Sequence, residues 1–224
     1  MSGCASNLLR MALVSVEGLD GAGKRTLIDR LVAQLRARGV RPATLAFPRY
    51  GRSVHADLAA EALRGGHGDV AASVNAMALL FALDRAGARD DLSKLLADND
   101  IVILDRYVAS NAAYSAARLE QPADGEIVAW VGGLEFGRFA LPVPRVQLLL
   151  DVPTEVAVAR ARRRGELDES RALDAYERDG GLQRRTAEVY RELARRDWYG
   201  PWWTYRSGDD PADLAARLAE IAGE

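Results

Sequence analysis

Residues 14–26, which read VSVEGLDGAGKRT, decide the fold that we expect for this chain. An apolar run at 12–16 leads into this glycine-rich turn, and the run predicts a buried strand. Beyond the turn, apolar residues recur at helical spacing from Leu27 to Leu35, and Gly39 supplies a helix C-cap. The stretch therefore joins a strand to a helix through a glycine-rich turn.

The turn has the spacing Gly18-x4-Gly23-Lys24, which is typical of a phosphate-binding loop. Glycine lets the backbone amides face anionic oxygens, and the helix N-terminus and the lysine add positive charge. A chance glycine turn is the alternative, and the fitting strand and helix argue against it. Arg25 occupies the position where Ser or Thr usually ligates magnesium, and Thr26 comes one residue late.

Length and composition limit the possible classes of protein. A chain of 224 residues, 49% of them apolar, suits one domain or one domain with a mobile insert. A formal charge of -2 argues against a general polyanion binder. The single cysteine, Cys4, excludes an intrachain disulfide and indicates a cytosolic setting. We find no run long enough to span a membrane. Residues 1–10 read as an appendage to a domain at 11–224.

Strands alternate with helices along the chain, which predicts an α/β fold with a parallel sheet. A helical region at 73–96 is apolar over much of its circumference, so we expect it to contact both the sheet and a second subunit. The expected strands are 12–16, 42–47, 100–105, 145–151 and 202–206. The expected helices are 27–39, 54–63, 73–96 with a break near Gly87, 110–118, 126–139, one opening at Pro153, one ending near Arg196, and 211–222.

Ligands of such folds bind beyond the carboxyl ends of the strands. Asp105 and Arg106 follow the clearest buried strand, so we expect them beside the phosphate loop. Arg106 could bind a phosphate with two hydrogen bonds, whereas a surface ion pair is its alternative role. For Asp105 the alternative is a helix cap or a partner for an arginine.

Arg160, Arg163 and Arg164 share one helix face and precede a glycine and a charged segment. Such clusters usually face solvent, but here they suit a mobile lid at 160–171 that closes over phosphates. Phe81 and Arg85 lie one helical turn apart. They could stack on a flat base and donate to its carbonyl edge, although composition alone favours a core role for Phe81.

Several segments together resemble the thymidylate kinases, especially those of mycobacteria and related actinobacteria. The segments read EGLDGAGKRT at 17–26, LAFPRYG at 45–51, LFALDRAG at 80–87, ILDRYVASNAAYSAA at 103–117 and DAYERD at 174–179. The resemblance implies a P-loop NTPase-type three-layer fold, as in nucleoside monophosphate kinases, with a five-stranded parallel sheet flanked by helices. It also implies a cytoplasmic homodimer that uses Mg²⁺ and ATP to convert dTMP to dTDP, without nucleic acid or membrane partners.

The resemblance assigns roles to individual residues. Lys24, Asp20, Arg106 and Arg164 would be catalytic. ATP would be bound by Gly18, Leu19, Asp20, Gly21, Ala22, Gly23, Lys24, Arg25, Thr26, Arg160 and Arg164, with Arg171 as a further lid candidate. The substrate would be bound by Asp20, Phe47, Tyr50, Phe81, Arg85, Arg106, Asn111, Tyr114 and Tyr176, with Asp174 nearby. Tyr114 would press on the sugar where a ribose hydroxyl would lie.

Arg25 cannot ligate a metal, because it is a permanent cation without an acceptor. We therefore expect a Mg²⁺ near the acceptor phosphate, held by Asp20 directly and by Glu177 through water. Alternatively, Asp20 caps the loop or pairs with Arg25.

Three other functions stay open at the level of sequence. A kinase for another pyrimidine nucleotide or a deoxynucleoside is the first, and a nucleoside kinase needs a carboxylate base near a sugar hydroxyl. A nucleotide-hydrolysing switch is the second, and it needs loops that respond to the γ-phosphate. The third is a degenerate binding module, against which the intact Lys24 and Arg106 argue.

Overall fold

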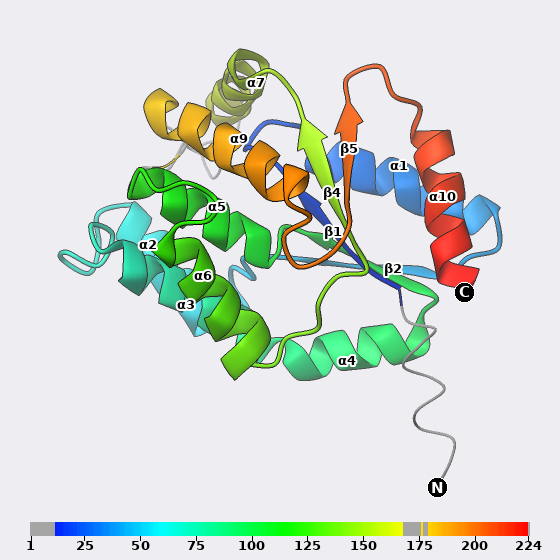
Figure 1. The fold of residues 1–224 in the computed structure, drawn as a ribbon, viewed down its shortest axis with the longest axis horizontal. Coiled ribbons are helices and arrows are strands. Elements are labelled where there is room, and N and C mark those ends of the chain that lie inside the picture. The colour runs from blue at the N-terminus through cyan, green and yellow to red at the C-terminus, as the bar shows by residue number, and fades with distance from the viewer. Residues whose placement is uncertain (1–11, 168–175, 177–178, 224) are drawn as a thin grey trace, which may run out of the picture.

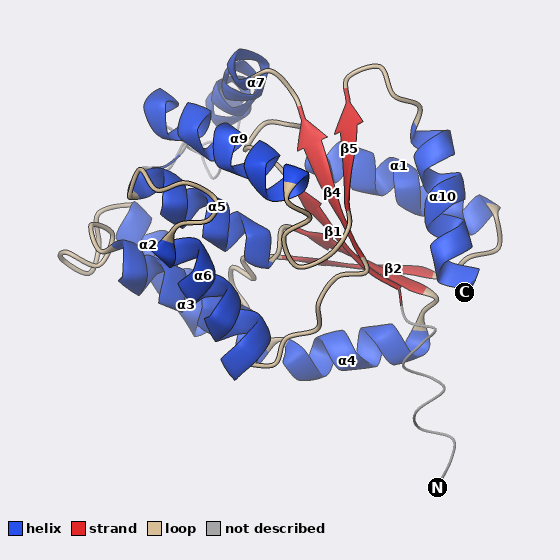
Figure 2. Cartoon of the chain, in the orientation of Figure 1, coloured by secondary structure: helices blue, strands red, loops and turns tan. Residues whose placement is uncertain are grey.

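A computed structural model describes residues 12–167, 176 and 179–223 of the chain. Its centre is a five-stranded parallel sheet in the order β2-β3-β1-β4-β5 (Figures 1 and 2). The predicted strands and fold class are confirmed, with ends that move by about one residue. The strands are β1 (Ala12–Glu17), β2 (Pro42–Ala46), β3 (Ile101–Asp105), β4 (Val146–Asp151) and β5 (Trp202–Arg206).

Helices cover both faces of the sheet, so the molecule has three layers (Figure 1). The central strand β1 is buried along its whole length, as its continuous apolar run predicts. One face packs on α1 (Lys24–Ala37) and α10 (Pro211–Gly223). The other packs chiefly on α5 (Val108–Arg118), α6 (Glu126–Gly132) and α9 (Gly180–Arg195).

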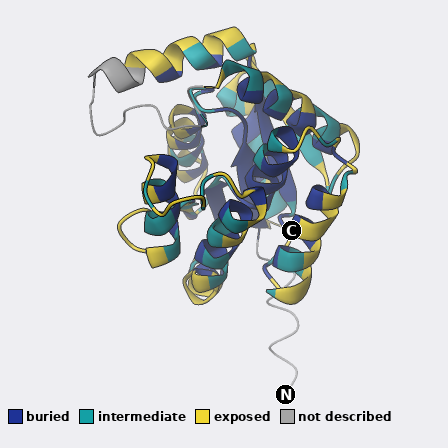
Figure 3. Ribbon diagram, turned by 90° about the vertical axis from the view of Figure 1, so that its left-hand side faces the viewer, coloured by how far each residue is buried: buried dark blue, intermediate teal, exposed yellow. Residues whose placement is uncertain are grey.

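The remaining described helices are α2 (Val54–Leu63), α3 (Val74–Gly87), α4 (Arg89–Asp98) and α7 (Thr154–Leu167). The sheet is coloured as buried, and the outer sides of the helices are coloured largely as exposed (Figure 3). The predicted helical region at 73–96 is divided at Ala88, close to the expected break at Gly87. No helix in the described ranges is long and apolar enough to cross a membrane.

The predicted single helix at 126–139 is wrong in detail, because its second half is the π-helix η2 (Gly133–Arg138). Phe139 N donates to Leu134 O at 2.9 Å, a five-residue step that widens the turn. Gly132 precedes the widened segment, and a Cβ there would lie 2.6 Å from the ring of Tyr199. Close packing against that ring therefore requires glycine where an ordinary helix would prefer another residue.

Candidate active site

The phosphate loop has the backbone that its glycines predict. Gly18, Gly21 and Gly23 have φ of 140°, 77° and 101°. A Cβ on Gly21 would lie 2.0 Å from the carbonyl oxygen of Ala157 on α7. Only a glycine in this position lets α7, the predicted base of the lid, pack directly on the loop. Arg160, also on α7, donates from Nη1 to Ala22 O at 3.5 Å, so this predicted ATP ligand lies at the loop.

Lys24 is buried and donates from Nζ to two carbonyl oxygens of the loop, Gly18 O at 3.1 Å and Leu19 O at 2.8 Å. Burial, together with the nearby Arg106 charge, lowers the pKa of Lys24 to about 8, against the opposing effect of the neighbouring carboxylates. Phosphate oxygens could replace the two carbonyls as acceptors. Lys24 therefore also holds the backbone of the loop together through these two hydrogen bonds. The sequence predicted only its role in binding phosphate.

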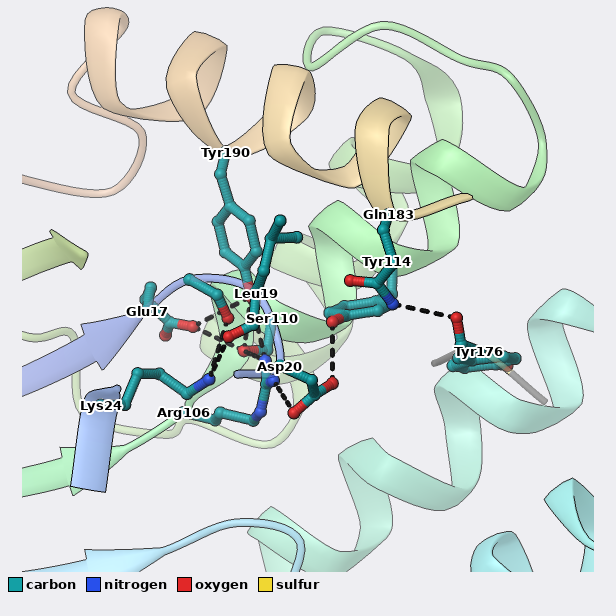
Figure 4. A network of polar contacts seen from close by, with 11 residues as sticks. Glu17, Leu19, Asp20, Lys24, Arg106, Ser110, Tyr114, Tyr176, Gln183 and Tyr190 are labelled. Atoms are coloured by element: carbon teal, nitrogen blue, oxygen red, sulfur yellow. Dashed lines mark hydrogen bonds and ion pairs between the residues drawn. The ribbon is translucent and has the colours of Figure 1, made fainter. Parts of the chain in front are cut away.

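Arg106 lies immediately beyond β3 and has φ of 66°, a left-handed conformation that is costly for a side chain with a Cβ. Its amide donates to Val16 O at 3.0 Å, which fixes the residue against β1. Its Nη2 donates to Asp20 Oδ1 at 2.6 Å, and Tyr114 donates its hydroxyl to Asp20 Oδ2 at 3.0 Å (Figure 4). The structure therefore brings Asp20, Arg106 and Tyr114 together beside the phosphate loop.

The electrostatics of this cluster keep Asp20 ionised. Burial would raise the pKa of Asp20, but the Arg106 and Lys24 charges outweigh burial and hold that pKa well below its usual range. Asp20 is therefore ionised and its charge is matched by Arg106. Lys24 remains as a second cation at the same place. The carboxylates of Asp105 and Glu17 also act on Lys24, so the two cations lie among several acidic side chains beside the loop.

Behind Arg106 lies a buried polar network that sequence reasoning missed (Figure 4). Ser110 donates its hydroxyl to Glu17 Oε2 at 2.6 Å and accepts from Arg106 Nη1 at 3.1 Å. The hydroxyl of Tyr190 lies 2.8 Å from that of Ser110 and 3.5 Å from Glu17 Oε2. Glu17 is fully buried, and its Oε1 has no hydrogen-bond partner among the described residues. Burial raises the pKa of Glu17 despite the Ser110 hydrogen bond.

Two of the residues expected to bind the base, Arg85 and Asn111, contact the same carboxylate, that of Glu135. Arg85 is buried, and its Nη2 donates to Glu135 Oε1 at 2.7 Å while its Nε donates to Oε2 of the same carboxylate. Asn111 donates from Nδ2 to Glu135 Oε1 at 2.8 Å and to Ala78 O at 2.9 Å. Phe81 is partly buried one turn before Arg85 on α3. Glu135 was not among the expected site residues.

The other expected substrate residues are placed unevenly. Tyr176 stacks on Tyr114 with ring centroids 6.0 Å apart and 16° between planes. Phe47 is buried against Tyr107, with ring centroids 5.9 Å apart. Tyr50 is 51% exposed, so it is not enclosed by the cluster. Arg164 lies in α7, while Arg171, Asp174 and Glu177 fall outside the described residues.

The residues after Lys24 do not join the anion site. Arg25 is exposed and pairs with Asp29 at 3.2 Å, and Thr26 is also exposed. The alternative pairing of Asp20 with Arg25 is therefore wrong, because Asp20 pairs with Arg106. No group of three or more potential metal ligands occurs in the part of the chain that the structure describes. Each Asp20 oxygen accepts one hydrogen bond and keeps a lone pair, which fits a site where Mg²⁺ takes one carboxylate, phosphate oxygens and waters.

The missed residues differ in the signal that could have found them. Ser110 lies only four residues after Arg106, and Glu17 ends an apolar strand next to the loop, so both positions were visible in the sequence. Tyr190 and Glu135 left no comparable signal. Glu135 looks like a solvent-facing acid on an ordinary helix, and it is buried on the π-helical segment.

Comparison with known proteins agrees with this geometry. The family model described as thymidylate kinase matches residues 16–200. A thymidylate kinase of Mycobacterium tuberculosis (strain H37Rv) is 58% identical over 207 residues, which are 92% of this chain and 97% of the relative. A thymidylate kinase of Xanthomonas oryzae pv. oryzae (strain PXO99A) is 38% identical over 173 residues, 77% of this chain and 67% of the relative. The chain, with its phosphate loop and its Arg106 cluster on a five-stranded parallel sheet, belongs to the thymidylate kinase family.

Proposed function

We propose that this chain phosphorylates dTMP to dTDP, with ATP as the phosphoryl donor. Its membership of the thymidylate kinase family supports the activity. The observation that carries the assignment to a site is the pairing of Arg106 with Asp20 beside Lys24 of the phosphate loop. This pairing supports the proposal, because the cation that we propose for the acceptor phosphate lies next to the loop that we propose for the donor.

The acceptor of a nucleotide kinase is already anionic, so its phosphate needs no general base. Positioning and neutralisation of charge carry the reaction. Arg106 would hold the acceptor phosphate, and Lys24 would move from the loop carbonyls to the donor phosphates. Arg160 and Arg164 on α7 would approach the transferring group from the lid side. Bound Mg²⁺, with Asp20 as its carboxylate ligand and Glu177 as a water-mediated one, would neutralise phosphate charge.

Substrate selection follows from the same cluster. Tyr114 is held by its hydrogen bond to Asp20 and by its stacking on Tyr176, so its ring can exclude a ribose hydroxyl by bulk. Phe81 would stack on the base. Phe47 would lie beside the acceptor phosphate, with Tyr50 reaching it from the loop after β2.

We further propose that the enzyme works as a cytoplasmic homodimer and takes no nucleic acid or membrane as a partner. We propose that α3, which is apolar over much of its circumference, contacts the second subunit. We assign residues 11–224 to the kinase domain, 160–171 to its lid, and 1–10 to an appendage.

The activity is tested with purified protein, labelled ATP and the acceptors dTMP, dUMP, UMP, CMP and thymidine. We expect labelled dTDP as the main product, with dUMP a poorer acceptor and thymidine unused. Phosphorylation of thymidine itself would indicate a nucleoside kinase. ATP hydrolysis that is rapid without any acceptor would indicate a switch protein. Either result would overturn the proposal.

A further inference from the structure

A buried carboxylate, Glu135, lies between the two side chains that we expect to contact the base. It has no exposed surface, and Arg85 and Asn111 are 3% and 5% exposed. Both of them donate to the Glu135 carboxylate. Residues of α3 and α5 are thus joined through one side chain of η2.

The contact with Glu135 leaves Asn111 with a fixed orientation. An amide nitrogen has two protons, and Asn111 donates them to Glu135 Oε1 and Ala78 O. Both partners can only accept, so the amide cannot be turned over. Its Oδ1 receives no hydrogen bond from a described residue and is an acceptor alone. Asn111 therefore presents an acceptor to any ligand beside it.

The same carboxylate leaves Arg85 as a donor. Glu135 takes hydrogen bonds from Nε and Nη2, so the protons on Nη1 remain for a ligand. Burial would lower the pKa of Arg85, but the Glu135 carboxylate raises it above its usual value. The guanidinium therefore stays charged in its buried position. Together the two side chains present one acceptor and one donor.

Thymine and uracil carry an N3–H donor next to a C4 carbonyl acceptor, and cytosine has an acceptor and an amino donor in those positions. The Asn111 acceptor and the Arg85 donor match the N3–H and the C4 carbonyl of thymine and uracil. They oppose cytosine at both atoms, because there N3 accepts and the C4 amino group donates. A polar group that is buried against the wrong partner is strongly disfavoured. The pair therefore discriminates 4-oxo from 4-amino pyrimidines, and it does not read the 5-methyl group.

We propose that Glu135 is a positioning residue that sets this selectivity, because it fixes Arg85 as donor and Asn111 as acceptor at once. The proposal rests on the proposed function, since it assigns the pyrimidine edge that the same site reads. Glu135 acts through its two neighbours and does not itself contact the base.

The backbone that carries Glu135 is well anchored. Phe136 packs on Tyr199 with ring centroids 4.5 Å apart and on Trp198 at 6.0 Å. Gly132 lies against the Tyr199 ring, where a Cβ would come to 2.6 Å. Aromatic packing from the chain after α9 thus fixes η2. A rigid support of this kind is what a selective binding site requires.

The test uses Glu135→Gln and measures kcat/KM for dTMP, dUMP and dCMP. Wild type should prefer dUMP to dCMP by about 100-fold or more. In Glu135→Gln this ratio should fall by about tenfold, because the amide nitrogen that replaces one carboxylate oxygen cannot accept from Arg85 and the buried guanidinium loses its counter-charge. The dTMP-to-dUMP ratio should stay within about twofold, since the methyl contact is elsewhere. KM for ATP should not change.

Two further variants separate positioning from a merely structural role. Asp84→Asn removes another fully buried carboxylate, which bonds to Arg49 and to neither Arg85 nor Asn111. It should leave the dUMP-to-dCMP ratio unchanged. If Glu135→Gln does not fold, Glu135→Asp decides, because it keeps the buried charge for Arg85 but is too short to reach both partners.

An unchanged dUMP-to-dCMP ratio in the folded Glu135 variant would overturn the proposal. So would an equal fall of kcat/KM for all three nucleotides. A wild type that phosphorylates none of them would instead refute the proposed function, so the two failures are distinguishable.

Discussion

Replacing Ser110 with alanine tests the buried network behind Arg106. The hydroxyl donates to Glu17 and accepts from Arg106, and both hydrogen bonds are lost in Ser110→Ala. Glu17 would retain only the long contact with Tyr190. A buried polar group without its partner costs about 1–3 kcal/mol. For a chain of this size that corresponds to a fall in Tm of about 4–8 °C at the middle of the range.

The loss in Ser110→Ala should depend on pH. Burial raises the folded-state pKa of Glu17 above its ordinary value of 4.5. The folded state therefore holds this proton more tightly than the unfolded state does. The stability that protonated Glu17 contributes is present below pH 4.5 and is lost as pH rises through the folded pKa. The Ser110 hydrogen bond stabilises the ionised form, so its removal raises this pKa further. The destabilisation should therefore be larger at about pH 8 than at about pH 5.

Chemical denaturation of wild type and Ser110→Ala at both pH values measures this difference. Ser115→Ala is the matched control, because Ser115 is also buried on α5 and makes no side-chain hydrogen bond to a described residue. Glu17→Gln cannot ionise, and in that background the pH dependence of the Ser110 effect should vanish. A Ser110 effect that equals the Ser115 effect at both pH values would refute the role of the network.

Three further predictions concern individual side chains. For wild type, kcat/KM for ATP should fall as pH rises through about 8, where free Lys24 loses its proton, and Lys24→Met should lose most transfer at every pH while it remains folded. Tyr114→Ala should reduce the preference for dTMP over ribothymidine monophosphate by kcat/KM, and an unchanged ratio would remove Tyr114 from the sugar site. Asp20→Asn should require more Mg²⁺ for half-maximal rate and should bind less Mn²⁺ near the acceptor phosphate, whereas metal dependence like that of wild type would exclude Asp20 as a ligand.

The fold was predictable because its signals are local. The apolar run into Glu17 and the run into Asp105 each mark a buried parallel strand, and the glycines of the loop mark the strand-to-helix turn. The convergence of Asp20 and Arg106 also followed from topology, since the carboxyl ends of β1 and β3 are adjacent in a parallel sheet.

What the sequence did not predict depends on contacts between distant elements. Glu135 is 50 residues from Arg85, and its burial requires the π-helical turn and the aromatic packing of Phe136. The sequence likewise offered several cations for Asp20, and the structure pairs it with Arg106, which has a left-handed backbone. Neither feature follows from periodicity or from spacing along the chain.

The central claim is that Arg106, held by Asp20 and Ser110, binds the acceptor phosphate, and calorimetric binding of dTMP and thymidine to wild type and Arg106→Met tests it most directly. Thymidine lacks only the phosphate, so the two ligands and two proteins form a cycle that isolates the contact. We predict that Arg106→Met binds dTMP about 10- to 100-fold more weakly and binds thymidine within about twofold of wild type. Equal weakening of both ligands, or unchanged binding of dTMP, would contradict the account.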